Sequence, residues 1–131
     1  DEYGGTPMMY AIRGGHGDIA EVLVSAGASV NSKNQFGKTP LIYASRGGHA
    51  GMVEMLIQRG AKTDTRDADN KTPLMYAIDG GHREVVEFLL RAPGVTVSAQ
   101  VRKLMEEKFG LEAVSRMLDP RPPMTTLPDR K

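Results

Sequence analysis

The chain has 131 residues, of which 40% are hydrophobic and 25% charged, with a formal net charge of +1 and no cysteine. This length fits one domain, and the composition is ordinary for a globular protein. The lack of cysteine excludes disulfide bonds and thiol chemistry, and the small net charge argues against nucleic-acid binding driven by bulk charge. No segment predicts a membrane span or a signal peptide, so we expect a cytoplasmic protein, with a nuclear location still open.

A motif that begins with Thr-Pro and ends with Gly-Gly-His occurs three times. It starts at Thr6, Thr39 and Thr72, so its period is 39 − 6 = 72 − 39 = 33 residues. A fixed period of this length is typical of a repeat protein whose units stack on one another. We therefore expect three stacked units, which cover residues 1–33, 34–66 and 67–97.

Each unit begins with a predicted turn followed by a short helix. Gly4, Gly37 and Asn70 share one position of the turn, which favours residues that accept a positive φ. The threonine of the motif can cap a helix, and the proline after it fits the first helical turn. Apolar residues then recur at helical spacing and predict a buried face: Met8, Ala11, Ile12, Leu41, Ala44, Leu74, Ala77 and Ile78.

A second helix is predicted after the histidine of each motif. Its apolar residues recur at i, i+3 and i+4, which predicts one buried stripe. The stripe consists of Ile19, Val22 and Leu23, then Met52, Met55 and Leu56, then Val85, Phe88 and Leu89. Gly27 and Gly60 follow at the position where a left-handed residue ends a helix. Neither helix buries its apolar face alone, so the units must stack to form a core.

The turn, Thr-Pro-Leu, Gly-His and a closing Gly-Ala, taken together, resemble the ankyrin repeat family over residues 1 to about 98. The resemblance implies an all-α repeat solenoid, in which helix-turn-helix units stack and β-turns project from one side. The family pattern has a histidine after Thr-Pro-Leu, where this chain has Met9, Ile42 and Met75. We therefore expect packing to replace the hydrogen bonds that this histidine makes in the family.

Residues 98–118 lack the motif but still predict two helices, separated by Gly110. Their apolar stripes are Val101, Leu104, Met105 and Phe109, then Leu111, Val114, Met117 and Leu118. We interpret them as a degenerate fourth unit that caps the stack, so that the repeat domain covers residues 1–118; a helix bound by a partner is the alternative. Residues 119–131 contain four prolines and predict an extended tail or linker.

The three histidines of the motif, His16, His49 and His82, do not predict a metal site. Equivalent positions on stacked helices lie about 8–10 Å apart, whereas a zinc ligand lies about 2.1 Å from its metal. The chain has no nucleophile motif and no phosphate-binding loop. We therefore expect no enzyme activity, no cofactor and no metal, and we assign the histidines a hydrogen bond near the start of the second helix.

The resemblance places partner contacts at the turn tips and at the end of each first helix. The candidates at the tips are Tyr3, Phe36, Lys38, Asp69 and Lys71, and those at the helix ends are Arg13, Arg46 and Asp79, a ladder of mixed sign. Tyr10, Tyr43 and Tyr76 form a second ladder, for which core packing and ligand contact both stay open. Tyr43 and Tyr76 are therefore included among the partner-binding candidates.

These candidates predict a protein–protein interaction module, a scaffold or adaptor that binds a segment of a partner through the turn tips and the concave helix face. The middle unit, residues 34–66, has five basic and two acidic side chains, net +3, which favours an acidic or mixed acidic-apolar ligand. We expect a monomer that binds neither nucleic acid nor membrane. Two alternatives remain: part of a larger enzyme or channel that positions a substrate or tethers the chain, and a structural spacer. The start at Asp1, without Met, favours a fragment of a longer chain.

Overall fold

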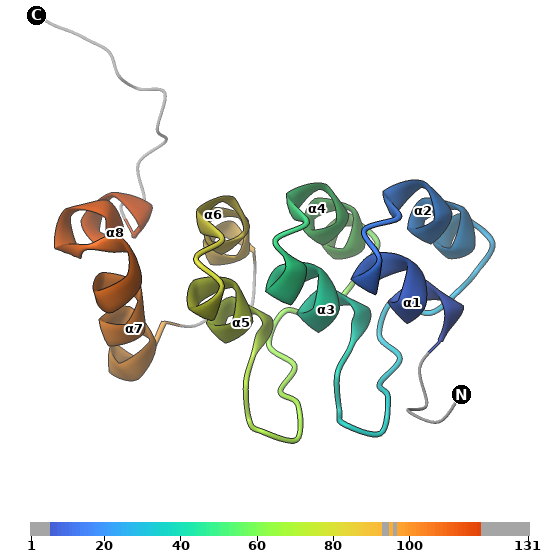
Figure 1. Ribbon diagram of the computed structural model, residues 1–131, viewed down its shortest axis with the longest axis horizontal. Coiled ribbons are helices and arrows are strands. Elements are labelled where there is room, and N and C mark those ends of the chain that lie inside the picture. Colours follow the sequence, from blue (N-terminus) through green and yellow to red (C-terminus); the bar gives the residue numbers. More distant parts are fainter. Residues whose placement is uncertain (1–5, 93–94, 96, 119–131) are drawn as a thin grey trace, which may run out of the picture.

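The computed structural model describes residues 6–92, 95 and 97–118, and these residues form eight helices and no strand. The helices are α1 (Pro7–Arg13), α2 (Gly17–Ser25), α3 (Pro40–Gly47), α4 (Ala50–Gln58), α5 (Pro73–Asp79), α6 (Arg83–Arg91), α7 (Ala99–Phe109) and α8 (Leu111–Met117). Helices α1, α3 and α5 lie in one row and α2, α4 and α6 in another, and the loops before α3 and α5 project beyond the first row (Figure 1). The predicted all-helical repeat stack is confirmed.

The Thr-Pro motif begins the first helix of each unit. Oγ1 of Thr6, Thr39 and Thr72 accepts a hydrogen bond from the backbone N–H three residues later, at 3.2, 3.3 and 3.3 Å respectively. A proline follows in the first turn, where its missing N–H leaves no carbonyl without a partner. Ser98 caps α7 in the same way, since its Oγ lies 3.2 Å from the N–H of Val101. The predicted threonine caps are confirmed.

One continuous apolar core runs through the whole stack. It contains the predicted residues of the first helices: Met8, Ala11, Ile12, Leu41, Ala44, Leu74, Ala77 and Ile78. Met9 and Ile42, at the position of the family histidine, are also buried, and Met75 is half-buried. Helix α7 packs against α5, and α8 packs against α7. The last two helices thereby add Val101, Met105 and Val114 to the core.

The predicted stripe of the second helices is wrong in part. Ile19 and Val22 of α2 are 53% and 66% exposed. In α4 the buried residues include Val53 beside Met52, so the stripe contains the i+1 position as well. Met52 is covered because the preceding unit lies against it: a Cβ added to Gly17 would be 3.8 Å from its Cγ. Ile19 has the same repeat position as Met52, but no described helix precedes its unit to cover it.

The glycine pairs of the motif make room for histidine rings. A Cβ added to Gly48 would lie 2.5 Å from the ring of His82, and one added to Gly47 would lie 2.6 Å from that of His49. His82 thereby reaches the preceding unit, where its Nε2 is 2.9 Å from the backbone carbonyl oxygen of Arg46. The predicted hydrogen bond is thus found for His82, although none of the three histidine side chains caps its own helix. His49 and His82 both contact the preceding unit, at Gly15 and Gly48 respectively.

Candidate binding surface

The turns of units two and three are each built around one buried polar side chain, Asn34 and Asp67. Oδ1 of Asn34 accepts hydrogen bonds from the backbone N–H groups two and four residues later, at 2.9 and 3.0 Å. Oδ1 of Asp67 accepts the same two bonds at the same distances. Such side-chain bonds hold a turn without a neighbouring strand. The next residues at the tip include Gly37 and Asn70, whose φ values of +74° and +63° confirm the predicted turn position.

The other polar atom of each turn residue holds a tyrosine of the same unit. Nδ2 of Asn34 donates to the hydroxyl of Tyr43 at 2.6 Å, and the hydroxyl of Tyr76 donates to Oδ2 of Asp67. Tyr43 and Tyr76 are half-buried, whereas Tyr10, at the same position of unit one, is 47% exposed. The hydroxyls of Tyr43 and Tyr76 thus form hydrogen bonds that stabilise the turns. The tyrosine ladder is therefore described neither by core packing alone nor by ligand contact alone.

Asp67 also connects units two and three, because its Oδ2 lies 2.9 Å from Nζ of Lys38 in the preceding unit. Burial alone would raise the pKa of the Asp67 carboxyl, but hydrogen bonds from Tyr76, from the backbone of Lys71 and from Lys38 lower this pKa to about 2. Burial would likewise lower the pKa of Lys38, but its hydrogen bonds to Asp67 and Tyr76 raise that pKa above its usual value. Both partners are therefore charged at neutral pH.

Units one and two do not share this ion pair. The positions of Lys38 and Asp67 are occupied one unit earlier by Gly5 and Asn34, which carry no charge. The tips of units two and three are joined a second time, because the backbone N–H of Ala68 donates to the carbonyl oxygen of Phe36 at 2.9 Å. The second junction of the stack is thus held at the turns by an ion pair and a backbone hydrogen bond.

Cations pack over the tyrosine rings beside the turns. The guanidinium of Arg13 lies 5.4 Å from the ring centroid of Tyr43. The ammonium groups of Lys38 and Lys71 lie 5.5 and 5.4 Å from that of Tyr76. A cation this close to an aromatic face is attracted to it. We call the set the tyrosine–cation surface; it consists of Arg13, Lys38, Tyr43, Arg46, Lys71 and Tyr76.

Arg46, near the end of α3, differs from the other cations of this surface. By repeat position Arg46 corresponds to Arg13, so the equivalent aromatic partner would be the ring of Tyr76. That ring already contacts two lysines. The guanidinium of Arg46 is exposed and has neither an ion pair nor a ring contact within the part of the chain that the structure describes. Asp79, the third member of the predicted ladder, pairs with Lys71 at 3.5 Å. The three members of this ladder, Arg13, Arg46 and Asp79, therefore lie in three different environments.

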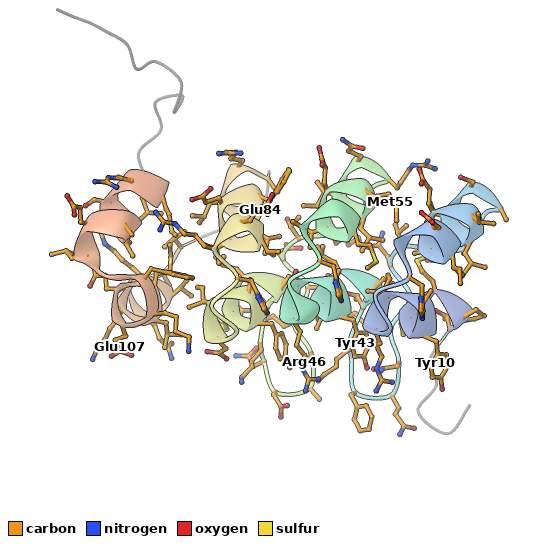
Figure 2. All side chains as sticks on the ribbon, turned by 45° about the horizontal axis from the view of Figure 1, so that its top comes forward. Tyr10, Tyr43, Arg46, Met55, Glu84 and Glu107 are labelled. Carbon is orange, nitrogen blue, oxygen red and sulfur yellow. The ribbon has the colours of Figure 1, made fainter. Side chains whose placement is uncertain are left out.

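The structure places most of the predicted contact residues on one side of the stack. Figure 2 shows Tyr10, Tyr43 and Arg46 along the edge that lies beside the turns. Phe36 is 41% exposed at the tip of unit two, and Asp69 is exposed at the tip of unit three.

Tyr3 lies outside the described residues. The predictions also left out Asn34 and Asp67, although these two share a repeat position three residues before Gly37 and Asn70. Both are residue types that often bond to the backbone of a following turn, which was the available signal.

A family model described as Ankyrin repeats (3 copies) matches residues 27–101, and a model described as Ankyrin repeat matches residues 3–35. The chain belongs to the ankyrin repeat family. Ankyrin repeats are generally protein–protein interaction modules and are typically not enzymes. A comparison with curated proteins found no significant match.

Two further findings hold for residues 6–92, 95 and 97–118 of the ankyrin stack. No helix in it is long and apolar enough to cross a membrane. No three of its His, Asp or Glu side chains are grouped so that they could hold a metal ion. The matched ankyrin repeats end at residue 101, so most of α7 and all of α8 lie beyond them.

Proposed function

We propose that this ankyrin repeat domain binds an extended acidic segment of a partner protein along the tyrosine–cation surface. The observation that supports this most is the environment of Arg46. Arg13, Lys38 and Lys71 already contact a ring or a carboxylate, whereas Arg46 can pair with a partner carboxylate without breaking an existing contact. An arginine fork also suits a carboxylate in geometry, since it can donate two parallel hydrogen bonds.

Exposed aromatic side chains of units one and two would supply the apolar part of the contact. Phe36 at the tip of unit two and Tyr10 on α1 are 41% and 47% exposed. Large aromatic residues often contribute much of the binding energy of an interface. A ligand that combines a carboxylate with an apolar side chain would therefore match this surface better than a purely acidic one.

The distribution of charge along the chain favours one position on the stack for such a ligand. The middle unit has a net charge of +3, whereas residues 1–33 carry two basic and four acidic side chains, net −2. Complementary charge raises the association rate and selects partners, and salt screens it. Binding should therefore be centred on unit two and should weaken as the salt concentration rises.

The test compares the wild type with Arg46→Glu and with Arg59→Glu. Arg59 is an exposed arginine of the same unit at the end of the outer helix α4, so its reversal changes the net charge equally. Segments selected by the wild type from a peptide display library rich in Asp, Glu and apolar residues are titrated by fluorescence anisotropy. We expect Arg46→Glu to weaken binding at least about tenfold and Arg59→Glu to leave it unchanged. Both variants should unfold within about 0.5 kcal/mol of the wild type.

Four outcomes would count against this assignment. Equal weakening by both variants would show that only net charge matters, and equal affinity for all three proteins would place the ligand elsewhere. Failure to select any segment would favour the structural spacer. A selected segment from the same polypeptide would favour the alternative in which the repeats tether a larger chain.

A further inference from the structure

A groove of about 540 Å³ lies between α2 and α4. Figure 2 shows Met55 at this junction, on the edge of the stack away from Arg46. Met52 and Met55 form the apolar part of its wall, Glu21 and Glu54 are on its rim, and no lysine or arginine lines it. His49 and Gln58 also line it. The groove therefore combines an apolar methionine wall with polar and acidic side chains, and its charge is opposite to that of the tyrosine–cation surface.

The groove is open because two glycines line it. A Cβ added to Gly51 would have no atom within 4 Å, and Gly17 begins α2 on the other wall. At the next junction, between α4 and α6, the residues at these two positions are Ala50 and Glu84. Both of those residues carry side-chain atoms that the two glycines between α2 and α4 lack.

Neither rim carboxylate pairs with a lysine or arginine in the part of the chain that the structure describes, although Nε2 of Gln58 donates to Glu54 at 3.5 Å. In unit three the equivalent residue, Glu87, pairs with Arg83 four residues earlier at 3.5 Å. Glu21 and Glu54 have glycine and alanine four residues earlier, and neither forms an ion pair within the described residues. Two exposed carboxylates on adjacent helices therefore flank the groove and can accept cations from outside.

The floor of the groove can adapt to an apolar ligand. Met52 is buried and Met55 is half-buried, so part of Met55 is accessible. Methionine side chains are flexible and polarizable, and they are common on surfaces that accept differently shaped partners. A volume within the range of about 300–1,000 Å³ typical of ligand sites accommodates several side chains.

We propose that this groove binds a basic amphipathic helix of a partner protein. Apolar side chains of that helix lie against Met52 and Met55, and its lysine or arginine side chains pair with Glu21 and Glu54. The walls of the groove are helices whose backbone groups are already bonded, so an extended segment would find no strand edge to pair with. A helix satisfies its own backbone groups and only has to place its apolar stripe in the groove. This proposal does not depend on the tyrosine–cation surface.

The experiment uses the methyl signals of methionine as local reporters. The chain is labelled at its methionine methyl groups and titrated with a synthetic amphipathic peptide of leucine and lysine. A peptide of the same pattern with glutamate in place of lysine is the control ligand. We expect the signals of Met52 and Met55 to shift with the lysine peptide only, while those of Met8 and Met105 in the distant core stay in place.

Variants then test the two halves of the proposal separately. Glu21→Gln combined with Glu54→Gln should weaken binding of the lysine peptide about tenfold. Glu107→Gln combined with Glu112→Gln removes the same charge from α7 and α8 and should change nothing. Gly51→Leu fills the groove without a change of charge, at a helical site that is open to a side chain, and should abolish the shifts.

Several results would overturn the proposal. One is binding of the lysine peptide without shifts at Met52 and Met55, and another is undiminished binding to Gly51→Leu. Equal binding of the glutamate peptide would remove the role of the rim carboxylates. The absence of any shift at millimolar peptide would show that the groove takes no such helix.

Discussion

Single residues decide how neighbouring ankyrin units are joined at their turns. Asn34 and Asp67 form the same turn and hold the same tyrosine position, but only Asp67 carries a charge. Only in its case does the preceding unit supply a lysine, Lys38, within reach. The choice between amide and carboxylate therefore follows from the neighbour, because a buried carboxylate without a cation would be destabilising.

Replacement of Asp67 by Asn should remove the ion pair and keep the turn, since Asn34 shows that an amide makes the same backbone bonds. The pKa of Asp67 is about 2 in the folded chain, against an ordinary value of 3.8. A depressed pKa stabilises the fold above the unfolded value, and this stabilisation is lost as the pH falls through the folded value. We expect Asp67→Asn to lower the free energy of unfolding by about 2 kcal/mol at neutral pH and by little below about pH 2.

Urea unfolding at a series of pH values measures this difference. Asp64→Asn is a suitable control, because Asp64 is an exposed aspartate in the loop before the same turn. If the two variants show the same dependence on pH, the ion pair with Lys38 does not stabilise the fold in the way described.

At the scale of helices, the contacts between units depend on residues without side chains. The glycine pairs that end the first helices admit histidine rings from two units, as His82 shows at Gly48. Gly48 also has a φ of +73°, which disfavours any residue with a Cβ. The motif therefore both ends a helix and prepares a contact surface for the next unit.

Gly48→Ala should destabilise the stack, because the new methyl group would overlap the ring of His82. The alanine would also have to adopt a positive φ, which is unfavourable for a residue with a Cβ. We expect a loss of about 2–4 kcal/mol in the free energy of unfolding. Gly51→Ala is the matched control: it adds the same methyl group to a helix at an open site and should be neutral or stabilising by up to about 1 kcal/mol. Thermal unfolding followed by circular dichroism compares the two, and equal effects would contradict the steric explanation.

The elements were predictable because their signals are local. The period of 33 residues, the Thr-Pro caps and the apolar spacing indicate where helices begin and which first-helix residues are buried. The exposure of Ile19 and Val22 was not predictable in this way, because their burial depends on a neighbouring unit and not on their own helix. The same holds for the candidate site. Its residue types could be located from the repeat positions, but the isolation of Arg46 depends on lysines that contact Tyr76 in three dimensions.

At the scale of the whole molecule, the last unit of the ankyrin stack needs a polar face toward the solvent. We propose that residues 98–118 provide it at the C-terminal side. Met105 is fully buried, Val101 and Val114 join the common core, and α7 packs on α5. Ion pairs along the exposed faces of α7 and α8, such as Arg102–Glu106 at 3.2 Å, suit a solvated surface. A terminal repeat with a polar outer face is a general requirement for solubility.

Removal of residues 98–118 together with all that follows should lower the melting temperature and promote self-association, because it uncovers apolar residues of unit three. Removal of residues 119–131 alone is the control and should change neither property.

Met105→Asp should destabilise the full chain by about 3 kcal/mol, since it buries a charge without a partner. Thermal unfolding with light scattering measures both effects. An unchanged melting temperature and monomeric state after the longer truncation would instead favour helices that a partner binds.

The unequal turns have a further consequence for how the stack opens. Lys38 and Asp67 join units two and three, whereas Gly5 and Asn34, at the same repeat positions one unit earlier, carry no charge. The open groove lies at the first junction too. Local opening should therefore begin at unit one, so that amide hydrogens of α1 and α2 exchange with solvent sooner than those of α3 to α6. Because an end unit opens early in any stack, the informative comparison is with Asp67→Asn, in which the exchange rates of the two regions should move closer together. If the substitution leaves their ratio unchanged, the strength of the turns does not set the order in which the units open.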